Sequence, residues 1–400
     1  MKVCVVGLGY IGLPTTLMLA SHGVDVTGVD KNKSIVSSLR KGIVTFEEKG
    51  LDTLFQTAVH NQVVFSDTLI QADVYIIAVA TPYDPVSKKV DAQYVIAAVE
   101  DVLTVCPQHA VIVIESTVSP GTIDRSVRPL VQDRAHLVHA PERIIPGNMV
   151  YELKHNSRTI GADDAETAGK IKQLYTTFCD GEIVLTDIRT AEMSKVVENT
   201  YRDINIAFAN ELAKICRDGG MNVYEIIRIA NLHPRVNILS PGPGVGGHCI
   251  SVDPWFLVGD YPMEAKLIRA AREINDSMPR FVLNRALEIM KEKQLADFSR
   301  VGLYGLTYKE NVDDTRESPT LQLLSEIKAS GIAAPQVYDP FVKTTLVDNQ
   351  HQSLQVFLDR CDFVIVMVGH EQLRKNPAIL NGKTVLDTRH IGGIKDAELM

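Results

Sequence analysis

The segment Val3-Cys-Val-Val-Gly7-Leu-Gly9-Tyr-Ile-Gly12 decides the fold class of this chain. A short apolar run leads into glycines spaced GxGxxG, and a helical pattern follows. Such glycines permit a tight turn, close approach of the backbone to a pyrophosphate, and close packing of helix on sheet. Asp30 closes the next strand-like run, where a carboxylate accepts hydrogen bonds from a ribose 2′-hydroxyl and repels a 2′-phosphate. The motif predicts a site for NAD rather than NADP; the alternative is a turn whose glycines serve only the backbone.

Strand-like and helical patterns alternate before and after a long, mainly helical region. The first strand-like runs are Lys2 to Gly7, Val24 to Val29, Val63 to Phe65, Val74 to Ala80, Val111 to Glu115 and Leu137 to His139. A helix is expected from about Thr190 to Gly219-Gly220, and Pro279 should kink or divide a second one from Glu264 to about Lys293. Beyond Arg300 the strand-like runs are Val301 to Leu306, Gln336 to Asp339, Asp362 to Val368 and Thr384 to Leu386. The fold class predicted is α/β, with two Rossmann-like doubly wound sheets joined by a long central helix.

Composition excludes several classes of protein. The chain has 400 residues, a net charge of -8 and 45% apolar residues, which is typical of a globular protein with a substantial core. The acidic balance argues against nucleic acid as a partner, and no apolar run approaches the ~20 residues that span a bilayer. Six scattered cysteines without a CxxC pair argue against a disulfide framework and against a metal site. We therefore expect a cytoplasmic protein with no membrane segment.

Polar side chains recur where ligands of α/β proteins bind. Thr81, Ser116 and Thr117 follow apolar strands, as either cofactor contacts or ordinary turn residues. In the long helix Lys195, Asn199 and Arg202 form one polar stripe, which is either functional or simply solvated. On the opposite side of that helix, apolar residues should face a core or a partner chain; these are Val197, Ile204, Phe208 and Ile215.

The glycine-rich segment Gly246-Gly-His-Cys249-Ile-Ser-Val-Asp253-Pro carries the most specific chemistry. Cys249 lies outside any strongly apolar run and is a candidate thiolate nucleophile, whereas the other five cysteines are expected to be inert core residues. Asp253 is either a supporting carboxylate or a helix cap. The segments 233–237 and 308–318 concentrate basic and polar groups, either for a phosphate-bearing ligand or as solvent-exposed loops.

Taken together, six ordered motifs resemble the UDP-glucose/GDP-mannose dehydrogenase family over essentially the whole chain. They are VGLGYIGLP from Val6, ESTVSPGT from Glu115, HAPERIIPG from His139, TAEMSKVVENTYRDINIAFANEL from Thr190, HPRVNILSPGPGVGGHCISVDPWF from His233, and GLTYKENVDDTRESP from Gly305. The resemblance implies an NAD-binding domain at 1–185, a central helical dimerisation region with the cysteine loop at 186–295, and a UDP-sugar-binding domain at 296–400. It also implies a homodimer or larger homo-oligomer.

The resemblance assigns roles residue by residue. Cys249 would be the nucleophile and Lys195 the acid/base or oxyanion partner, with Asn199 and Asp253 supporting them. The implied NAD contacts are Gly7, Gly9, Tyr10, Ile11, Gly12, Asp30, Thr81, Thr117 and Arg316. The implied UDP-sugar contacts are Arg143, Ile144, Lys195, Asn199, Arg202, His233, Arg235, Gly246, Tyr308, Lys309 and Arg389, the last standing where relatives often carry lysine. The part of Glu142 in hydrolysis stays open.

The expected reaction is a four-electron oxidation of the C6 alcohol of UDP-N-acetyl-D-mannosamine with two NAD, through a thiohemiacetal and a thioester on Cys249. UDP-N-acetyl-D-glucosamine is the alternative substrate. A nucleotide-sugar epimerase and an NAD-binding scaffold are the alternative classes; an epimerase commonly uses a Tyr-xxx-Lys pair, which the first domain lacks before a helix. Net formation of NADH separates the dehydrogenase from both.

Overall fold

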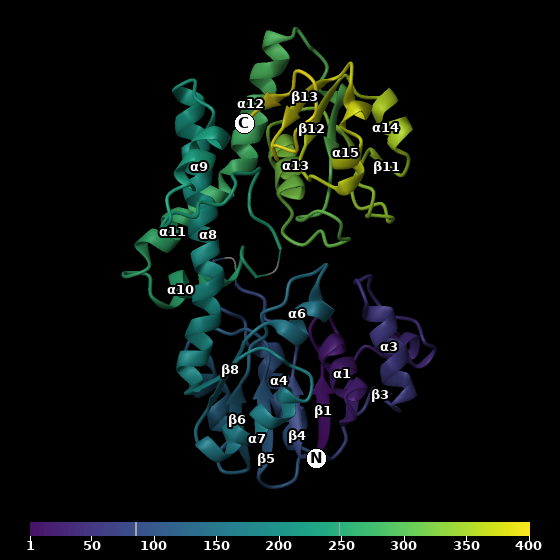
Figure 1. Cartoon of the computed structure of the whole chain (residues 1–400), viewed down its shortest axis with the longest axis vertical. Coiled ribbons are helices and arrows are strands. Elements are labelled where there is room, and N and C mark those ends of the chain that lie inside the picture. Colours follow the sequence, from purple (N-terminus) through teal and green to yellow (C-terminus); the bar gives the residue numbers. More distant parts are fainter. Residues whose placement is uncertain (85, 248) are drawn as a thin grey trace. The chain divides into compact units, whose positions relative to one another are not determined.

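The computed structural model describes residues 1–84, 86–247 and 249–400, and the chain divides into two compact units. Unit 1 comprises Met1–Glu198 and unit 2 comprises Asn199–Met400. The division falls inside one long helix, α8 (Ile188–Asp218), which continues without a break from one range into the other. Each unit holds one β-sheet flanked by helices (Figure 1).

Unit 1 is built on an eight-stranded sheet with the order β3-β2-β1-β4-β5-β6-β7-β8. Its neighbouring strands are parallel except β6 and β7, which are antiparallel. Because the strand order reverses at β1, the carboxyl ends of β1 and β4 lie at a switch point, where open α/β sheets bind ligands. The strands are β1 (Lys2–Val6), β2 (Asp25–Val29), β3 (Val64–Ser66), β4 (Val74–Ile77), β5 (Ala110–Ile114), β6 (Ala135–His139), β7 (Arg158–Ala162) and β8 (Ile183–Thr186).

Helices cover both faces of this sheet, so the strands are buried on two sides. In β1, Val3 and Val5 join the apolar cluster that includes α1, whereas Cys4 and Val6 join the cluster that includes α4. Burial on both faces explains why β1 is an unbroken apolar run. The helices of this unit before α8 are α1 (Gly12–Ser21), α2 (Lys33–Arg40), α3 (Leu51–His60), α4 (Gln93–Leu103), α5 (Arg128–Val131), α6 (Met149–His155) and α7 (Ala165–Thr176).

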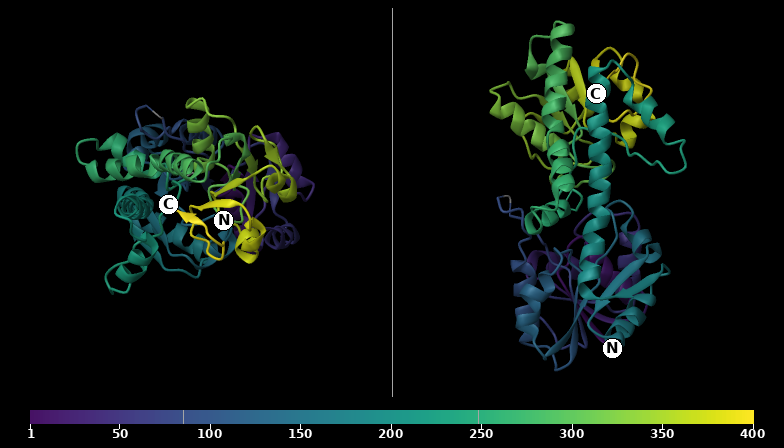
Figure 2. Two further views of the ribbon diagram at one scale, coloured as in Figure 1. Left: turned by 90° about the horizontal axis from the view of Figure 1, so that it is seen from above. Right: turned by 90° about the vertical axis from the view of Figure 1, so that its left-hand side faces the viewer.

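The helical region has the boundaries that glycine and proline predict. Figure 2 shows α8 as one long, unbroken helix. Gly220 has a φ of 65°, and the Met221 amide donates to the Cys216 carbonyl (2.7 Å), which closes α8 through a left-handed residue. Pro279 divides the later stretch as expected, since it occupies the first turn of α12, where its missing N–H costs no helical bond. The helices after α8 are α9 (Val223–Ala230), α10 (Asp253–Asp260), α11 (Lys266–Asp276) and α12 (Met278–Glu292).

Unit 2 also contains a six-stranded parallel sheet with the order β11-β10-β9-β12-β13-β14. Apolar clusters line its two faces, with Leu303 in one and Tyr304 in the other. The remaining elements are β9 (Val301–Tyr304), α13 (Pro319–Ala329), β10 (Gln336–Tyr338), β11 (Gln350–His351), α14 (Leu354–Asp359), β12 (Phe363–Val366), α15 (Glu371–Lys375), β13 (Thr384–Asp387) and β14 (Glu398–Leu399).

The predicted fold class is confirmed: the chain is α/β, with two mostly parallel sheets and a long intervening helix. Sequence patterns missed four strands, namely β7, β8, β11 and β14. The three-part domain division stays a prediction. In the ranges that the structure describes, every helix is too short or too polar to cross a membrane.

Candidate functional site

The glycine turn of unit 1 has the geometry that a dinucleotide requires. Gly7 has a φ of 94°, and a Cβ on it would lie 2.6 Å from the Ala78 carbonyl oxygen. A Cβ on Gly12 would collide with the Gly7 carbonyl, so this glycine permits close packing of α1 on β1. Gly9 is exposed, and a Cβ there would meet no atom within 4 Å. The backbone is thus open at Gly9, beside the N-terminus of α1, where a pyrophosphate fits.

Asp30 follows the last residue of β2, and its side chain binds the backbone of the glycine turn. Its Oδ2 accepts the Leu8 amide (2.8 Å) and its Oδ1 accepts the Asn32 amide (2.8 Å). A carboxylate has about four acceptor positions, so these two bonds leave capacity for ribose hydroxyls. Asp30 is only partly buried, and the unit 1 geometry fits NAD.

The other cofactor candidates of unit 1 differ in their surroundings. Tyr10 stacks on Phe46 with ring centroids 4.4 Å apart, whereas Ile11 is half-buried beside it. Thr81 is buried after β4, and Thr117 is half-buried after β5. The Ser116 hydroxyl donates to the Val79 carbonyl (2.7 Å), which favours the structural alternative for this serine.

Lys195 is buried on α8, not solvated. It is 5% exposed, and its positive charge acts on the pKa of His139 at the end of β6. Burial lowers the pKa of His139 to about 4. The hydrogen bond to the Ile114 carbonyl acts to raise this pKa, and the charge of Lys195 acts to lower it. His139 Nδ1 contacts the Ile114 carbonyl (2.8 Å), and the lowered pKa makes the ring neutral at pH 7.

Glu192 is a residue of this region that sequence reasoning missed. Its carboxylate accepts the amides of Gly121 (2.5 Å) and Ile123 (2.9 Å), and its side chain is fully buried. It thereby fastens the loop after Thr117 to the turn of α8 that precedes Lys195. Burial outweighs these hydrogen bonds and raises the pKa of Glu192 to about 7. The sequence signal that could have identified Glu192 is its position three residues before Lys195, which puts the two side chains on the same side of a helix.

The side chains of Arg143 and Glu142 make hydrogen bonds within unit 1. Arg143 donates to Glu198 through Nε (3.0 Å), to Ser157 through Nη1 (2.6 Å) and to Thr159 through Nη2 (3.1 Å). A second Glu198 contact and the Ser157 carbonyl engage the remaining donors of the guanidinium. The Glu142 carboxylate accepts the Ile144 amide (2.5 Å). The substrate contacts of Arg143 and Ile144 stay predictions, and for Arg143 the geometry favours a positioning role.

In unit 2 the candidate nucleophile lies just before α10. The Cys249 carbonyl accepts the amides of Val252 (3.1 Å) and Asp253 (2.8 Å), so a tight turn joins the thiol-bearing residue to the first turn of the helix. Asp253 is 3% exposed, and its Oδ2 accepts from Asn199 Nδ2 (2.6 Å). This bond connects α10 to α8 one turn after Lys195. Cys249, Asp253 and Asn199 therefore form one local arrangement.

The cysteines differ as predicted, with one exception. Cys249 is partly exposed and in no disulfide, whereas Cys4, Cys179, Cys216 and Cys361 are buried. Burial raises the pKa of Cys4 to about 11 and that of Cys361 to about 12, which keeps both thiols protonated. The expectation of a core position was wrong for Cys106, which is half-buried because it follows the end of α4 in a surface turn.

Two loops of unit 2, the one between β9 and α13 and the one after β13, approach the glycine-rich segment. A Cβ on Gly246 would lie 2.7 Å from Tyr308 Cβ, and a Cβ on Gly247 would lie 2.9 Å from the Tyr308 ring. The Gly247 amide donates to the Arg316 carbonyl (3.0 Å). Arg389 donates to the Met367 carbonyl (2.9 Å) and approaches the glycine-rich segment at Gly242. Desolvation lowers the pKa of Arg389. Lys309 follows Tyr308 in the same loop and is half-buried.

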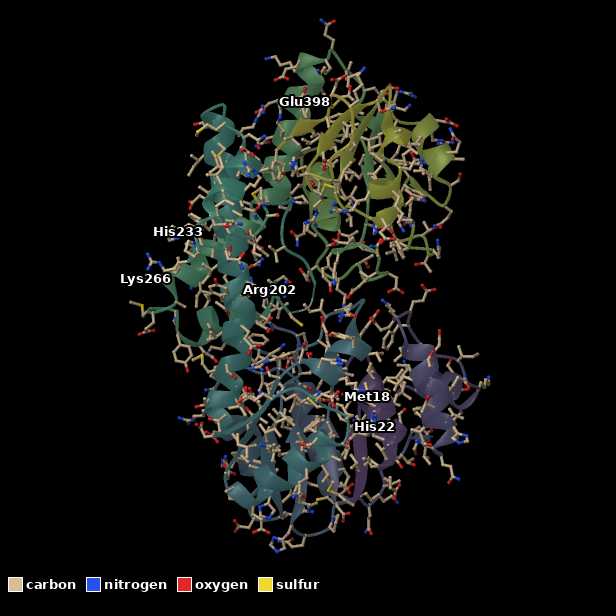
Figure 3. The ribbon with its side chains drawn as sticks, viewed as in Figure 1. Met18, His22, Arg202, His233, Lys266 and Glu398 are labelled. Atoms are coloured by element: carbon tan, nitrogen blue, oxygen red, sulfur yellow. The ribbon has the colours of Figure 1, made fainter. Side chains whose placement is uncertain are left out.

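Three basic candidates of unit 2 are exposed side chains. Arg202 lies on α8 and His233 lies after α9 (Figure 3). Arg235 follows two residues after His233. The His233 ring accepts the Arg235 amide (3.3 Å). The solvent-exposed alternative thus describes these three in the single chain. Elsewhere, the described residues include no group of three or more His, Cys, Asp or Glu arranged to hold a metal ion.

Comparison with known proteins adds independent findings. Three models of the UDP-glucose/GDP-mannose dehydrogenase family match the chain: the NAD-binding domain at residues 1–179, the central domain at 189–277 and the UDP-binding domain at 302–393. The first match confirms the prediction of NAD as cofactor.

Similar proteins cover nearly the whole chain. The UDP-N-acetyl-D-mannosamine dehydrogenase of Methanococcus maripaludis is 44% identical over 98% of this chain and 93% of its own. The NDP-N-acetyl-D-galactosaminuronic acid dehydrogenase of Ralstonia nicotianae is 40% identical over 98% and 96%. The solved structure of the UDP-D-ManNAc dehydrogenase from Pyrococcus horikoshii has a TM-score of 0.92 at 35% identity, covering 100% and 98%. The chain therefore belongs to the UDP-glucose/GDP-mannose dehydrogenase family of NAD-dependent nucleotide-sugar dehydrogenases.

Proposed function

We propose that this chain oxidises the C6 alcohol of UDP-N-acetyl-D-mannosamine to the carboxylate, with consumption of two NAD and one water per sugar. The observation that carries the proposal is the partly exposed Cys249 beside the Asn199–Asp253 hydrogen bond, in the unit that the UDP-binding family model matches. Relatives at 39 to 44% identity named for this substrate support the choice of sugar. Bound NAD supplies the oxidant by accepting a hydride in each of the two oxidations.

Cys249 is the nucleophile of the proposed reaction. Its thiolate sulfur adds to the C6 carbon of the aldehyde and forms a thiohemiacetal, and oxidation of that adduct leaves a thioester. Water attacks the thioester carbon, the C–S bond breaks, and the carboxylate leaves with the thiolate restored. A thiolate suits both steps because it adds readily to an aldehyde and is a good leaving group.

Lys195 and the Asn199–Asp253 pair support this chemistry. A lysine that is 5% exposed lies in a low-dielectric environment, where a positive charge stabilises a developing alkoxide more strongly than it would in water. Asp253 accepts from Asn199 and is held in the first turn of α10. In this position the carboxylate orients water or accepts a proton, which typically contributes on the order of 10²-fold or more.

The substrate nucleotide is assigned to the loops of unit 2. Gly246, Tyr308, Lys309 and Arg389 lie in segments that converge there, and the first three lie in or next to the packed Gly247–Tyr308 contact. Arg316 remains proposed for the cofactor. Arg202, His233 and Arg235, which are exposed in the single chain, are proposed to contact the sugar nucleotide in the assembled protein.

The assembled protein is proposed to be a homodimer or larger homo-oligomer formed through α8. Met193, Val197, Tyr201, Phe208 and Ile215 are between 36% and 63% exposed. At 100° per residue they lie within one ~80° stripe, opposite Lys195 and Asn199. A second copy presents the same stripe, so a two-fold pairing buries both. A cytoplasmic location, inferred from six cysteines outside disulfides, belongs to the same proposal.

Counting NADH per sugar tests the reaction. The purified chain is incubated with NAD and a panel of UDP-hexoses, including N-acetylmannosamine, N-acetylglucosamine and N-acetylgalactosamine, and NADH and uronate are quantified. We expect two NADH per uronate, with the highest kcat/KM for the mannosamine sugar. One NADH per sugar, or no net NADH, contradicts the four-electron reaction. A preference for another epimer corrects only the sugar.

Replacement of the thiol tests the covalent route. Cys249→Ser should retain binding of UDP and NAD while turnover falls by about 10³-fold or more, because a serine hydroxyl is a far weaker nucleophile at neutral pH. Cys106→Ser, at the other half-buried cysteine, is the matched control and should keep full activity. Uronate formation by Cys249→Ser at an undiminished rate would rule out the thioester.

The exposed stripe is tested by light scattering on a chromatography column. Phe208→Glu should shift the molar mass to that of a single chain, because a buried carboxylate cannot be accommodated between two apolar stripes. Tyr94→Glu, at an exposed aromatic residue of α4, is the matched control and should leave the molar mass unchanged. An unchanged oligomer in Phe208→Glu would place the interface elsewhere.

A further inference from the structure

The first turns of the two sheets share one hydrogen-bonding arrangement, with Asp339 in unit 2 as the counterpart of Asp30 in unit 1. In each sheet a glycine with positive φ follows the first strand, and its amide donates to the carbonyl of the last residue of the neighbouring strand. The amide of the residue after the glycine donates to an aspartate side chain, and this aspartate is the residue that follows the neighbouring strand. The matching bonds are Gly7 to Val29 (2.8 Å) and Leu8 to Asp30 (2.8 Å) in unit 1, and Gly305 to Tyr338 (2.8 Å) and Leu306 to Asp339 (2.6 Å) in unit 2.

Asp339 differs from Asp30 because the protein saturates it. Besides Leu306, Oδ2 accepts from the Thr307 amide (3.1 Å) and from His370 Nε2 (3.1 Å). Oδ1 accepts the Phe341 amide (2.8 Å) and, at longer range, the amide that follows it. The residue is 2% exposed. Burial acts against ionisation, but the His370 bond and these amides together lower the pKa of Asp339. No acceptor position remains for a ribose hydroxyl.

The bonds of His370 define its protonation. Nδ1 lies 3.0 Å from the Asn311 amide nitrogen, and an amide only donates, so Nδ1 carries no proton. Nε2 therefore carries the proton and donates it to Asp339. The ring is fully buried and stacks on Phe341 with centroids 5.1 Å apart, while the Tyr304 ring meets it edge-on at 6.0 Å. Its orientation is thus set from two sides.

His370 and Asp339 together hold the loop 307–311 on both sides of Tyr308 and Lys309. Before these residues, the Thr307 amide bonds Asp339, and the Thr307 hydroxyl donates to the Lys309 carbonyl (2.8 Å). After them, the Asn311 amide bonds His370. The side chain of Asn311 makes a second hydrogen bond to the same region: its Oδ1 accepts from the amide of Glu371, the residue after His370 (3.0 Å). The loop and the start of α15 are therefore interlocked.

We infer that His370 is a positioning residue for nucleoside diphosphate binding, acting through the loop 307–311 as a neutral imidazole with its proton on Nε2. Asp339 has exchanged the ribose role of Asp30 for the anchoring of that loop. The inference rests on the proposed function, in which Tyr308 and Lys309 hold the UDP part of the substrate. His370 itself touches only the protein, so its effect should appear in UDP affinity and not in NAD affinity.

Two substitutions separate the two bonds of the ring. In His370→Asn the side-chain oxygen lies near the position of Nδ1 and keeps an acceptor for the Asn311 amide. In His370→Gln the side-chain nitrogen reaches the position of Nε2 and keeps a donor for Asp339, but the Asn311 amide loses its partner. The Kd of UDP alone is measured by calorimetry, with the Kd of NAD as internal control, followed by KM and kcat with the UDP-sugar.

UDP affinity should depend mainly on whether the Asn311 amide keeps an acceptor at position 370. We expect His370→Gln to weaken UDP binding and raise KM for the UDP-sugar about tenfold, with kcat within about twofold and NAD binding unchanged. Tenfold corresponds to about 1.4 kcal/mol, the size of one net hydrogen bond. His370→Asn should restore UDP binding to within about threefold of the unsubstituted protein. Equal UDP affinity in all three, or equal losses of UDP and NAD affinity in His370→Gln, would overturn the inference.

A measurement on the unsubstituted protein keeps the inference testable even if both variants fold poorly. Nitrogen-15 NMR of histidine-labelled protein reports which ring nitrogen carries the proton, and we expect the His370 signal, assigned by its loss in His370→Asn, to show a protonated Nε2 and an unprotonated Nδ1. A proton on Nδ1 of His370 would overturn the inference. Failure of the unsubstituted protein to bind UDP, with this tautomer present, would instead overturn the proposed function on which the inference rests.

Discussion

Removal of the buried cation Arg272 should destabilise unit 2 in a way that depends on pH. Arg272, on α11, is 1% exposed and donates to Oδ1 of the fully buried Asp203 on α8 (2.6 Å). Asn275 donates to the same oxygen (2.8 Å). Even with these partners, burial raises the pKa of Asp203. In Arg272→Met the carboxylate loses its cation and becomes neutral by binding a proton.

The magnitude follows from the cost of that proton. Protonating a carboxyl group with an ordinary pKa of about 3.9 costs about 4 kcal/mol at pH 7 and about 1.5 kcal/mol at pH 5. The loss of stability in Arg272→Met should therefore be about 3 to 4 kcal/mol at pH 7, within the range for breaking a buried pair. It should shrink by about 1.4 kcal/mol per pH unit on acidification, because the folded variant keeps a proton that the unfolded chain releases above pH 4.

Urea unfolding at pH 5, 6 and 7, followed by circular dichroism, measures this difference between variant and unsubstituted protein, provided that the m-value stays constant. The matched control is Asp203→Asn combined with Arg272→Met, which lacks the titrating carboxyl group and should show a deficit independent of pH over this range. A deficit for Arg272→Met that is the same at pH 5 and pH 7 would refute the reasoning, as would a loss below about 1 kcal/mol at pH 7.

Two further predictions concern unit 1. Asp30→Ala should reduce the ratio of kcat/KM for NAD over NADP by at least about tenfold, because it removes both the ribose acceptor and the charge that repels a 2′-phosphate; an unchanged ratio would remove Asp30 from the ribose site. His139, with its pKa lowered to about 4, stays neutral when the unfolded chain binds a proton near pH 6.5, so acidification from pH 7 to pH 4 should cost the fold about 3 kcal/mol through this residue. His139→Asn, which keeps a donor for the Ile114 carbonyl and does not titrate, should lose that part of the acid sensitivity in the same urea assay; identical pH profiles would contradict it.

The strands missed from the sequence show where local patterns fail. β7 begins with Arg158, which a periodicity argument places at the surface, yet it is 3% exposed because Glu115 pairs with it at 3.0 Å and the Tyr175 ring lies 4.2 Å from its guanidinium carbon. β8 is an edge strand whose Val184 and Leu185 are exposed, so it lacks the alternation of a half-buried strand. Both strands depend on partners far away in the chain.

The candidate site divides in the same way. The glycine turn, the place of Asp30 beside it and the exposure of Cys249 could be predicted because their determinants lie in short segments with characteristic spacing. The burial of Lys195, the engagement of every Arg143 donor and the role of Glu192 could not. Glu192 meets Gly121 across 71 positions, and Arg143 meets Glu198 across 55. Nothing local in either segment encodes those encounters.

The sequence by itself thus determined the fold class and the cofactor, because turns, apolar runs and helix stops depend on neighbours within a few residues. Only the tertiary structure decided which charged groups are buried and what each one holds. Asp30 and Asp339 each follow a strand of a mostly parallel sheet. Asp30 keeps capacity for a ligand, whereas Asp339 is saturated by backbone amides and by His370, which lies 31 residues further along the chain. The physical reason is that hydrogen-bond capacity and desolvation depend on every group packed around a side chain, and the chain brings those groups together only on folding.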